Sequence, residues 1–148
     1  MNIIIKKDIN EDIINFLIDE SFKLFIQLYE IDTTNQLVLK RMKESLIEFY
    51  TSDIDTSTFY SAYIDNKIVG AGVIHTNNDF SDLFVKEEYQ NKGIGTYLIE
   101  TIIKDNEKKG TIYINGNKKY LNFFEKHGFI EYENNDKAVK MYRKVTNN

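Results

Sequence analysis

The first third of the chain predicts one short strand and two amphipathic helices. Residues 3–6 are apolar enough to form a strand, and Asn10 then provides an N-cap ahead of two acidic residues, which favour the positive end of a helix dipole. Apolar side chains three and four residues apart continue this helix to Leu28. A second helix is predicted over residues 36–50, with an apolar face formed by Leu39, Met42, Leu46 and Phe49.

The middle of the chain alternates with a period of two, which is typical of strands. Residues 59–64 and 67–76 form two such runs, and an Asp-Asn pair between them supplies turn residues, so a β-hairpin is predicted. Gly70 and Gly72 leave one face of the second strand without side chains. That bare face permits either close approach by another segment or a ligand, or a bulge with tight packing.

The second half of the chain changes to strand, helix, strand and helix, followed by two more strands. This order predicts a βαβ crossover, and therefore an α/β fold (α+β in some schemes) with a mixed sheet. Gly128 closes the last helix at its C′ position. No linker or internal repeat divides the chain, so a single domain over residues 1–148 is expected. The predicted elements are strand 80–86, helix 95–108, strand 111–115, helix 117–127 and strands 129–133 and 137–145.

Composition removes several classes of function. The chain of 148 residues has no Cys, which excludes disulfides, thiolate zinc sites and a catalytic Cys nucleophile. His75 and His127 are the only imidazoles and lie far apart in sequence, so no metal is expected. With 19 Lys+Arg against 23 Asp+Glu and no dense basic block, the net charge of −4 argues against a nucleic-acid partner.

Apolar stretches are too short for a membrane segment. Residues 68–74 form the longest one, against the ~20 residues that span a bilayer. Residues 3–5 are three isoleucines, and this run is too short for the apolar core of a signal peptide, which needs about 7 to 15 residues. We therefore expect a cytoplasmic protein with no membrane partner.

The segment over residues 83–98 joins an apolar strand to an amphipathic helix through a short loop that contains glycine. Free backbone N–H groups at a helix start bind phosphate oxygens, glycine lets the backbone come close, and Lys92 adds positive charge. The order Lys92-Gly93 excludes a Walker-type loop, and Leu98 stands where a dinucleotide fingerprint needs its third glycine. From the residues alone, a tight turn with close helix packing remains the alternative.

Two motifs give this segment a family resemblance. Gln90-Asn91-Lys92-Gly93-Ile94-Gly95 resembles the Gln/Arg-x-x-Gly-x-Gly/Ala loop of the GNAT acetyltransferase superfamily, and Leu83-Phe84-Val85 lies upstream as that family's fourth strand does. Further on, the Asn117, Phe123-Phe124 and Gly128-Phe129 series is similar to the family's second signature. The resemblance implies a mixed, largely antiparallel sheet of six to seven strands flanked by about four helices.

The resemblance also implies acetyl-CoA as cosubstrate and assigns residues to it. The pyrophosphate would lie on the backbone amides of the glycine loop, and the pantetheine arm would pair with the fourth strand where it splays from the fifth. The remaining contacts would come from the second signature. The implied cofactor-binding residues are Leu83, Phe84, Val85, Gln90, Asn91, Lys92, Gly93, Ile94, Gly95, Thr96, Asn117, Tyr120 and Phe124.

A lysine-like amine has a pKa of about 10.4 and is mostly protonated at neutral pH. Direct transfer therefore requires a base that removes a proton from the amine before it attacks. Asp79 lies six residues before Val85, where some family members carry a catalytic carboxylate. Strand alternation places Asp79 on the face of Leu83 and Val85 and turns Asp82 the other way, so Asp79 is preferred. Its alternative role is that of a solvated residue at the strand entry. The amide of Val85 is the expected donor to the oxyanion.

The general acid of the family is missing at its usual position. Many members carry Tyr four residues before the Gly of the Gly-Phe pair, and Phe124 stands there. Tyr120, one helical turn earlier, could reach the same sulfur or could be a core tyrosine. His75 could act as a base, although a lone His at a strand end is more often packed or exposed.

The resemblance therefore implies an acyltransferase that moves an acetyl group from acetyl-CoA to a primary amine of a small molecule or peptide. Residues 25–50 and 59–75 would form the acceptor pocket, and the acidic balance favours a cationic acceptor. A non-catalytic module that binds coenzyme A, motivated by Phe124, is the alternative from another class, and a purely structural α/β protein is the third. The oligomeric state is open, with a homodimer as one option.

Overall fold

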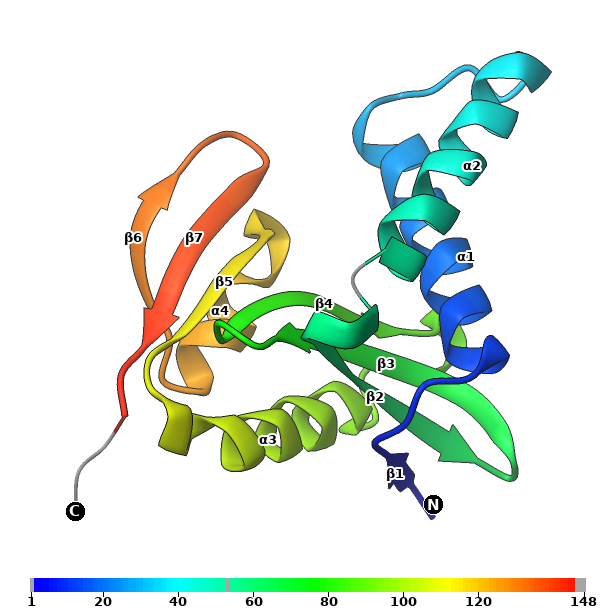
Figure 1. Cartoon of the computed structure of the whole chain (residues 1–148). Helices are drawn as coiled ribbons and strands as arrows, with labels where there is room; N and C mark the ends of the chain where they lie inside the picture. The colour runs from blue at the N-terminus through cyan, green and yellow to red at the C-terminus, as the bar shows by residue number, and fades with distance from the viewer. Residues whose placement is uncertain (1, 53, 146–148) are drawn as a thin grey trace.

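The computed structural model describes residues 2–52 and 54–145, and within them the chain forms one mixed sheet flanked by four α-helices (Figure 1). The predicted element order is confirmed throughout. The elements are β1 (Ile4–Lys6), α1 (Glu11–Leu28), α2 (Gln36–Ser52), β2 (Ser57–Ile64), β3 (Lys67–His75), β4 (Asp79–Val85), α3 (Ile94–Asn106), β5 (Ile112–Asn117), α4 (Leu121–Lys126), β6 (Ile130–Asn134) and β7 (Ala138–Arg143).

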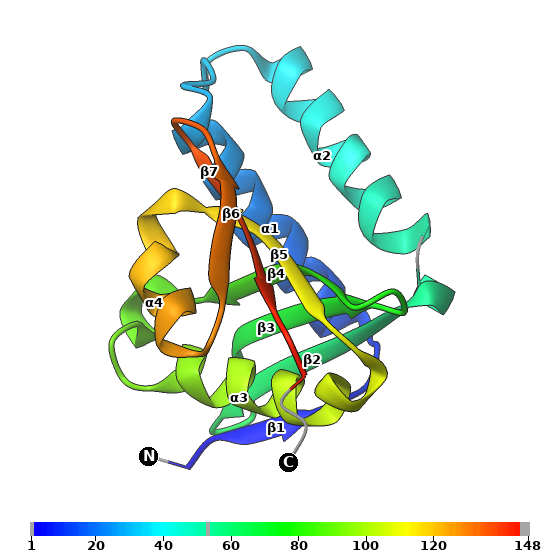
Figure 2. The same cartoon turned by 90° about the vertical axis from the view of Figure 1, so that its left-hand side faces the viewer.

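The sheet has seven described strands in the order β1-β2-β3-β4-β5-β7-β6. Every neighbouring pair is antiparallel except β4 and β5, which are parallel, as a βαβ crossover through α3 requires. Helices α1 and α2 cover one face of the β2–β4 half, while α3 and α4 lie on the opposite side (Figures 1 and 2). The β5-β7-β6 half leans away from this core, so the two halves of the sheet form an open angle.

The two faces of the sheet bury separate hydrophobic cores. On one face, α1 contributes Ile13, Phe16 and Leu17, which pack with Leu46 of α2. On the other, α3 contributes the apolar stripe expected from its sequence, and each fully buried Leu or Ile is worth about 1.5–3 kcal/mol. Asn10 caps α1 as predicted, because its side chain accepts a hydrogen bond from the Ile13 amide at 3.0 Å.

Gly70 and Gly72 on β3 allow α3 to pack unusually close to the sheet. A Cβ added at Gly72 would lie 2.6 Å from Cδ1 of Ile102, and one at Gly70 would lie 3.0 Å from Cδ1 of Leu98. The bare face is therefore used for the close approach of another segment of the chain, α3, which packs tightly against it. This close packing sets the distance of α3 from the sheet, and so the position of the first turn of α3 relative to β4.

A β-bulge interrupts β4 at Ser81. Asp82 pairs with Val73 of β3, but the next pair is Phe80 with Ile74, so Ser81 is an extra residue. Because the bulge reverses the alternation, Phe80 joins the core on the α3 side, where Leu83 and Val85 also pack. The expectation that Asp79 shares a face with Leu83 and Val85 is therefore wrong.

Strands β4 and β5 separate soon after they pair. Among the described residues, their ladder consists of Asp79 with Tyr113 and Phe80 with Ile114. Beyond Phe80, the side of β4 that would face β5 has no strand partner, and β5 continues along β7 instead. The splay expected between the fourth and fifth strands is thus present.

Candidate active site

The start of α3 presents backbone amides that the helix itself does not use. The first intrahelical bond of this helix joins the Tyr97 amide to the Gly93 carbonyl at 3.0 Å, so the amides of Ile94, Gly95 and Thr96 precede the ladder. Gly93 stands at the N-cap in the left-handed conformation, with φ of 86°, and offers no capping side chain. The helix therefore opens on free N–H groups at the positive end of its dipole, which is an arrangement that binds anions.

The loop before α3 is held in shape by its own residues. The Gln90 side chain donates from Nε2 to the Val85 carbonyl at 3.0 Å and so ties the loop to the end of β4. Asn91 adopts a positive φ of 61°, and Nζ of Lys92 lies 5.7 Å from the centre of the Tyr89 ring. Lys92 is exposed beside the free amides, so it can add positive charge to the same place.

The exposed edge of β4 offers further donors beside the loop. The Lys86 amide donates to the Val69 carbonyl of β3 at 2.9 Å. Because successive amides of a strand point in opposite directions, the Val85 and Leu83 amides point away from β3, into the splay. An extended ligand can pair with such an edge as a guest strand does. The splay and the start of α3 therefore form one continuous row of donors.

An aromatic side chain of α4 lies where the two parts of this row meet. A Cβ added at Gly95 would lie 3.6 Å from Cζ of Phe123 and 3.7 Å from Cγ2 of Val85, so these three residues meet where α3 begins. Phe124 turns instead into the core, against Gly116 and Phe129. Phe124 was the aromatic residue predicted for the site, whereas its neighbour Phe123 is the one that lies there. The helical period of α4 was the signal that could have separated the two.

Asn117 and Tyr120 lie at the end of β5, across the splay. Asn117 caps the short turn that follows, because its Oδ1 accepts a hydrogen bond from the Lys119 amide at 3.0 Å. Tyr120 is 41% exposed, and Nζ of Lys119 lies 5.6 Å from its ring centre. Tyr120 is therefore not a core tyrosine, and its hydroxyl is free of the packing that holds Phe124.

Asp79 stands at the opposite end of β4 from the glycine loop. Its side chain is exposed and accepts a hydrogen bond from Nδ2 of Asn77 at 3.0 Å. This matches the role of a solvated residue at the strand entry, which was the alternative to a catalytic role. The structure brings Leu83, Val85 and the residues of the glycine loop together, and it leaves Asp79 outside that group.

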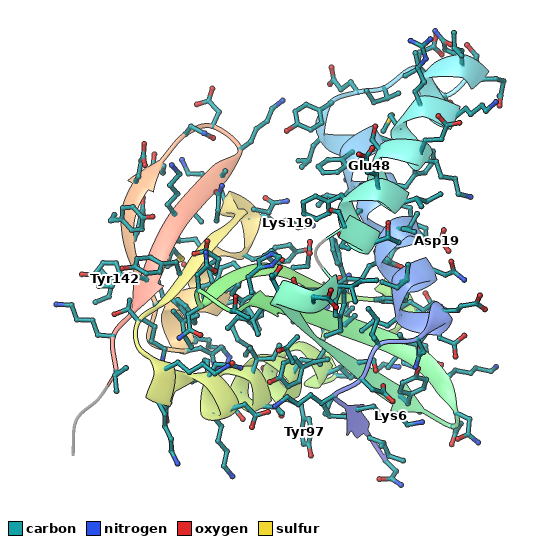
Figure 3. All side chains as sticks on the ribbon, viewed as in Figure 1. Lys6, Asp19, Glu48, Tyr97, Lys119 and Tyr142 are labelled. Carbon is teal, nitrogen blue, oxygen red and sulfur yellow. The ribbon has the colours of Figure 1, made fainter. Side chains whose placement is uncertain are left out.

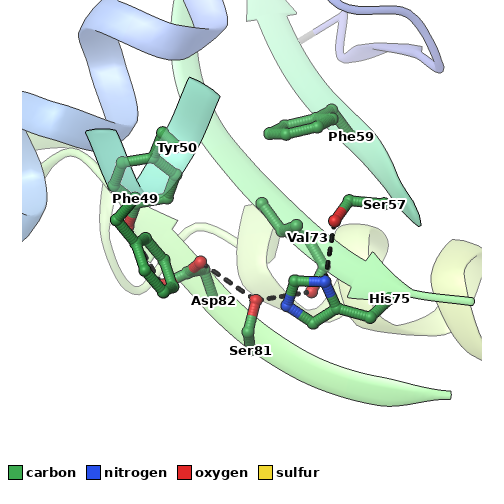
Figure 4. Close-up of a pocket in the computed structure, with 8 residues that line it drawn as sticks. All are labelled: Phe49, Tyr50, Ser57, Phe59, Val73, His75, Ser81 and Asp82. Atoms are coloured by element: carbon green, nitrogen blue, oxygen red, sulfur yellow. Dashed lines mark hydrogen bonds between the residues drawn. The ribbon is translucent and has the colours of Figure 1, made fainter. Parts of the chain in front are cut away.

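A second carboxylate on β4, Asp82, lies in a polar cluster on the α1/α2 side of the sheet (Figure 4). Its Oδ1 accepts from the Tyr50 hydroxyl at 3.2 Å, and its Oδ2 accepts from the Ser81 hydroxyl at 3.1 Å. Burial raises the pKa of the Asp82 carboxyl, while the hydrogen bonds from Ser81 and Tyr50 and the charge of His75 act in the opposite direction. The bulge places Ser81 on the same side of the strand as Asp82, an arrangement that simple alternation does not predict.

His75 completes the cluster from β3. Its Nδ1 shares a hydrogen bond of 2.7 Å with the Ser57 hydroxyl, which fixes the orientation of the ring. A cavity of about 10 Å³ lies between these groups, and aromatic side chains form much of its wall. The residues that line it are Phe49, Tyr50, Ser57, Phe59, Val73, His75, Ser81 and Asp82.

No helix in the part of the chain that the structure describes is long and apolar enough to cross a bilayer. No group of three or more His, Asp or Glu side chains within residues 2–52 and 54–145 is placed to hold a metal ion.

A known family model covers most of the chain. Residues 29–144, more than half of the chain, match the family model described as an acetyltransferase (GNAT) domain.

Solved structures of similar fold cover nearly the whole chain. PaiA N-acetyltransferase from Thermoplasma acidophilum, solved in complex with coenzyme A, has a TM-score of 0.75 at 21% identity and covers 97% of this chain and 99% of its own. PH1933 from Pyrococcus horikoshii has a TM-score of 0.70 at 23% identity, with coverage of 98% and 99%. A GNAT-family acetyltransferase from Staphylococcus aureus has a TM-score of 0.64 at 24% identity, with coverage of 98% and 100%. At these identities the likeness establishes the fold alone.

Proposed function

The chain belongs to the GNAT acetyltransferase family, and on that premise we propose that it transfers an acetyl group from acetyl-CoA to a primary amine of a small molecule or peptide. The observation that carries the proposal is the continuous row of free donors formed by the start of α3 and the splayed edge of β4. A ligand with a pyrophosphate at one end and an extended amide-bearing arm at the other fits such a row.

The residues of this chain fit the cosubstrate as follows. The amides of Ile94, Gly95 and Thr96 would receive the pyrophosphate, with Lys92 adding charge beside them. Leu83 and Val85 would pair with the pantetheine amides along β4. Phe123 and Asn117 would border the arm from the α4 side. Bound there, acetyl-CoA supplies an activated thioester at the splay.

The edge of β4 would also assist the reaction. An amide that points into the splay, that of Val85 or of Leu83, would donate to the thioester oxygen as it gains negative charge. Tyr120 would supply the proton to the departing sulfur, in place of the hydroxyl that Phe124 lacks. A thiol has a pKa near 8.5, so departure with partial protonation also gives a working enzyme.

Phe124 is the specific observation that favours the second candidate, a module that binds coenzyme A without transferring the acetyl group. The two candidates separate in one experiment, in which the thermal shift with acetyl-CoA and the release of thiol are measured across a panel of primary amines. We expect binding together with turnover of at least one amine. Tight binding without turnover of any amine would favour the module, and the absence of any thermal shift would contradict both.

Three narrower expectations stay predictions. The acceptor is expected to be cationic, because the net charge is −4. A cytoplasmic location and an absence of metal rest on the sequence patterns alone. A homodimer is one option for the assembly, and size-exclusion chromatography with light scattering tests it.

A further inference from the structure

The cluster around Asp82 has the chemistry of a proton acceptor. Both carboxylate oxygens accept hydrogen bonds, one from Tyr50 and one from Ser81. The Tyr50 hydroxyl shares a bond of 2.5 Å with Ser21 of α1, and since its own proton goes to Asp82, Ser21 is the donor there. The hydrogen bonds therefore run from α1 through α2 to β4 and converge on the carboxylate. This convergence fixes the orientation of the Asp82 carboxyl group.

His75 faces the same cavity from the other side. Ser57 engages Nδ1 of the ring, and the opposite ring nitrogen points toward Ser81 and Asp82 (Figure 4). The titratable groups around Asp82 are thus Tyr50 from α2 and His75 from β3, and their charge and hydrogen bonds act on the carboxyl directly. β2 and α1 add the neutral hydroxyls of Ser57 and Ser21.

We propose that this cavity receives the amine nitrogen of the acceptor and that Asp82, not Asp79, is the base that takes its proton. The proposal rests on the proposed function and adds the residues and the shape of the acceptor site. Asp82 is the residue directly before Leu83, whose amide points into the splay. A base and a donor to the thioester oxygen therefore follow one another along β4, on the two sides of the place where the amine must attack.

The proton balance closes with the groups present. An ammonium group R–NH3+ gives one proton to the Asp82 carboxylate and becomes a neutral amine. Its nitrogen forms the C–N bond to the acetyl carbon, and the C–S bond breaks. A second proton leaves the nitrogen and converts the thiolate to the thiol. His75 receives the first proton from Asp82 and returns it to solvent, because its ring is partly exposed at the end of β3.

The size of the cavity limits the class of acceptor. A cavity of about 10 Å³ has room for roughly one water molecule, and an ammonium head group is of similar size. Phe49, which is 49% exposed, stands at the rim beside Tyr50 and offers an apolar surface to the stem of the ligand. These features favour an unbranched primary alkylamine and disfavour its N-methylated analogues, which bring extra carbon atoms to the nitrogen.

Asp82→Asn tests the base, with thiol release measured at pH 7 for two acceptors. We expect kcat/KM to fall by ~100-fold or more for an alkylamine, and by far less for an alkoxyamine that is already neutral at this pH. Dissociation of acetyl-CoA should not change, which separates this test from one of the proposed function. Asp19→Asn is the matched control, because Asp19 lies on α1 and points away from the sheet (Figure 3).

Three outcomes overturn the proposal. The first is an Asp82→Asn variant with the alkylamine activity of the parent, and the second is an Asp79→Asn variant that shows the selective loss instead. The third is equal loss for both acceptors, which would indicate a structural role. His75→Gln provides a second route if the first variant folds poorly, since it should also lower alkylamine turnover selectively. A wild-type protein that prefers N-methylated amines would contradict the predicted shape of the cavity.

Discussion

Gly72 on β3 and Ile102 on α3 are packed so closely that a single methyl group does not fit between them: a Cβ at position 72 would lie 2.6 Å from Cδ1 of Ile102. This pair sets the distance of α3 from the sheet. It also sets where the first amides of α3 lie relative to the edge of β4, on which the proposed cosubstrate site depends. Packing in the core and the geometry of the site are thus coupled through one glycine.

Gly72→Ala should therefore destabilise the fold and displace α3. Overpacking of this kind costs about 1–3 kcal/mol, measurable as a lower free energy of unfolding in urea. Ile102→Val removes the atom that the new methyl group would meet, so the double variant should recover part of the loss. Gly95→Ala is the comparison, because its Cβ would make ordinary contacts of 3.6 Å or more. Independent, additive effects of the two substitutions would contradict the close contact.

Gly93→Glu should abolish most of the affinity for coenzyme A. The position faces open space at the mouth of α3, so the new carboxylate fits but repels the pyrophosphate from the free amides. We expect the Kd to rise by about 10- to 100-fold, measured by isothermal titration calorimetry.

Gly93→Ala separates charge from backbone strain at the same position. Gly93 has a φ of 86°, which any side chain makes costly, so both variants should lose roughly 1 kcal/mol of stability. The alanine variant should nevertheless keep most of its affinity. If the glutamate variant bound coenzyme A as tightly as the parent, the cradle at α3 would be the wrong site.

The sequence predicted the fold well because its signals are local. The Asn10 cap, the apolar stripe of α3 and the Gly128 stop each lie within one element, and each is confirmed. The glycine loop was found for the same reason. The face on which Asp79 lies depends instead on a bulge at Ser81, and a bulge is a property of how β3 and β4 pair. Simple alternation put Asp82 on its observed face, opposite Leu83, but it put Asp79 on the face of Leu83 and Val85, and the choice of Asp79 as the base rested on that placement.

The same limit applies to partners distant in sequence. Tyr50 reaches Asp82 across 32 positions and Ser21 across 29, and no period in the chain links them. Ser57 and His75 come together only because β2 and β3 pair in that register. A single Ser, Tyr or His in the sequence does not indicate which residue it will contact. Its partner becomes clear only when the sheet and α2 place it beside a carboxylate.

Tyr50→Phe should lower stability through the loss of two buried contacts. The variant leaves the Ser21 hydroxyl and one oxygen of Asp82 without their partner, and such a loss costs about 1–3 kcal/mol. Urea unfolding at neutral pH measures it. Phe49→Leu serves as a neighbouring control, because Phe49 makes no hydrogen bond in this cluster and is half exposed. Equal effects for both variants would mean that ring packing, and not the hydroxyl, stabilises the cluster.

Asp82→Asn should change how stability depends on pH. Burial raises the pKa of the Asp82 carboxyl in the folded state, so the folded protein binds its proton more tightly than the unfolded chain. The stability linked to that proton is present below the unfolded pKa of about 3.9 and is lost as pH rises through the folded value. Relative to wild type, the variant should therefore gain stability between acidic and neutral pH. Parallel curves of unfolding free energy against pH for the two proteins would contradict this linkage.

Tyr120→Phe should reveal whether an exposed tyrosine replaces the hydroxyl missing at Phe124. Tyr120 is 41% exposed at the start of α4, whereas Phe124 packs against Gly116, so the two side chains are held in different surroundings. If Tyr120 protonates the sulfur, its loss should reduce kcat by ~100-fold with little change in the Kd of acetyl-CoA. Tyr97→Phe is the matched control, because Tyr97 is exposed on α3 and points away from the sheet (Figure 3). Adding Phe124→Tyr to the first variant should restore part of the rate if a hydroxyl at position 124 reaches the sulfur. An unchanged kcat in Tyr120→Phe would instead mean that the thiolate departs without an acid from this helix.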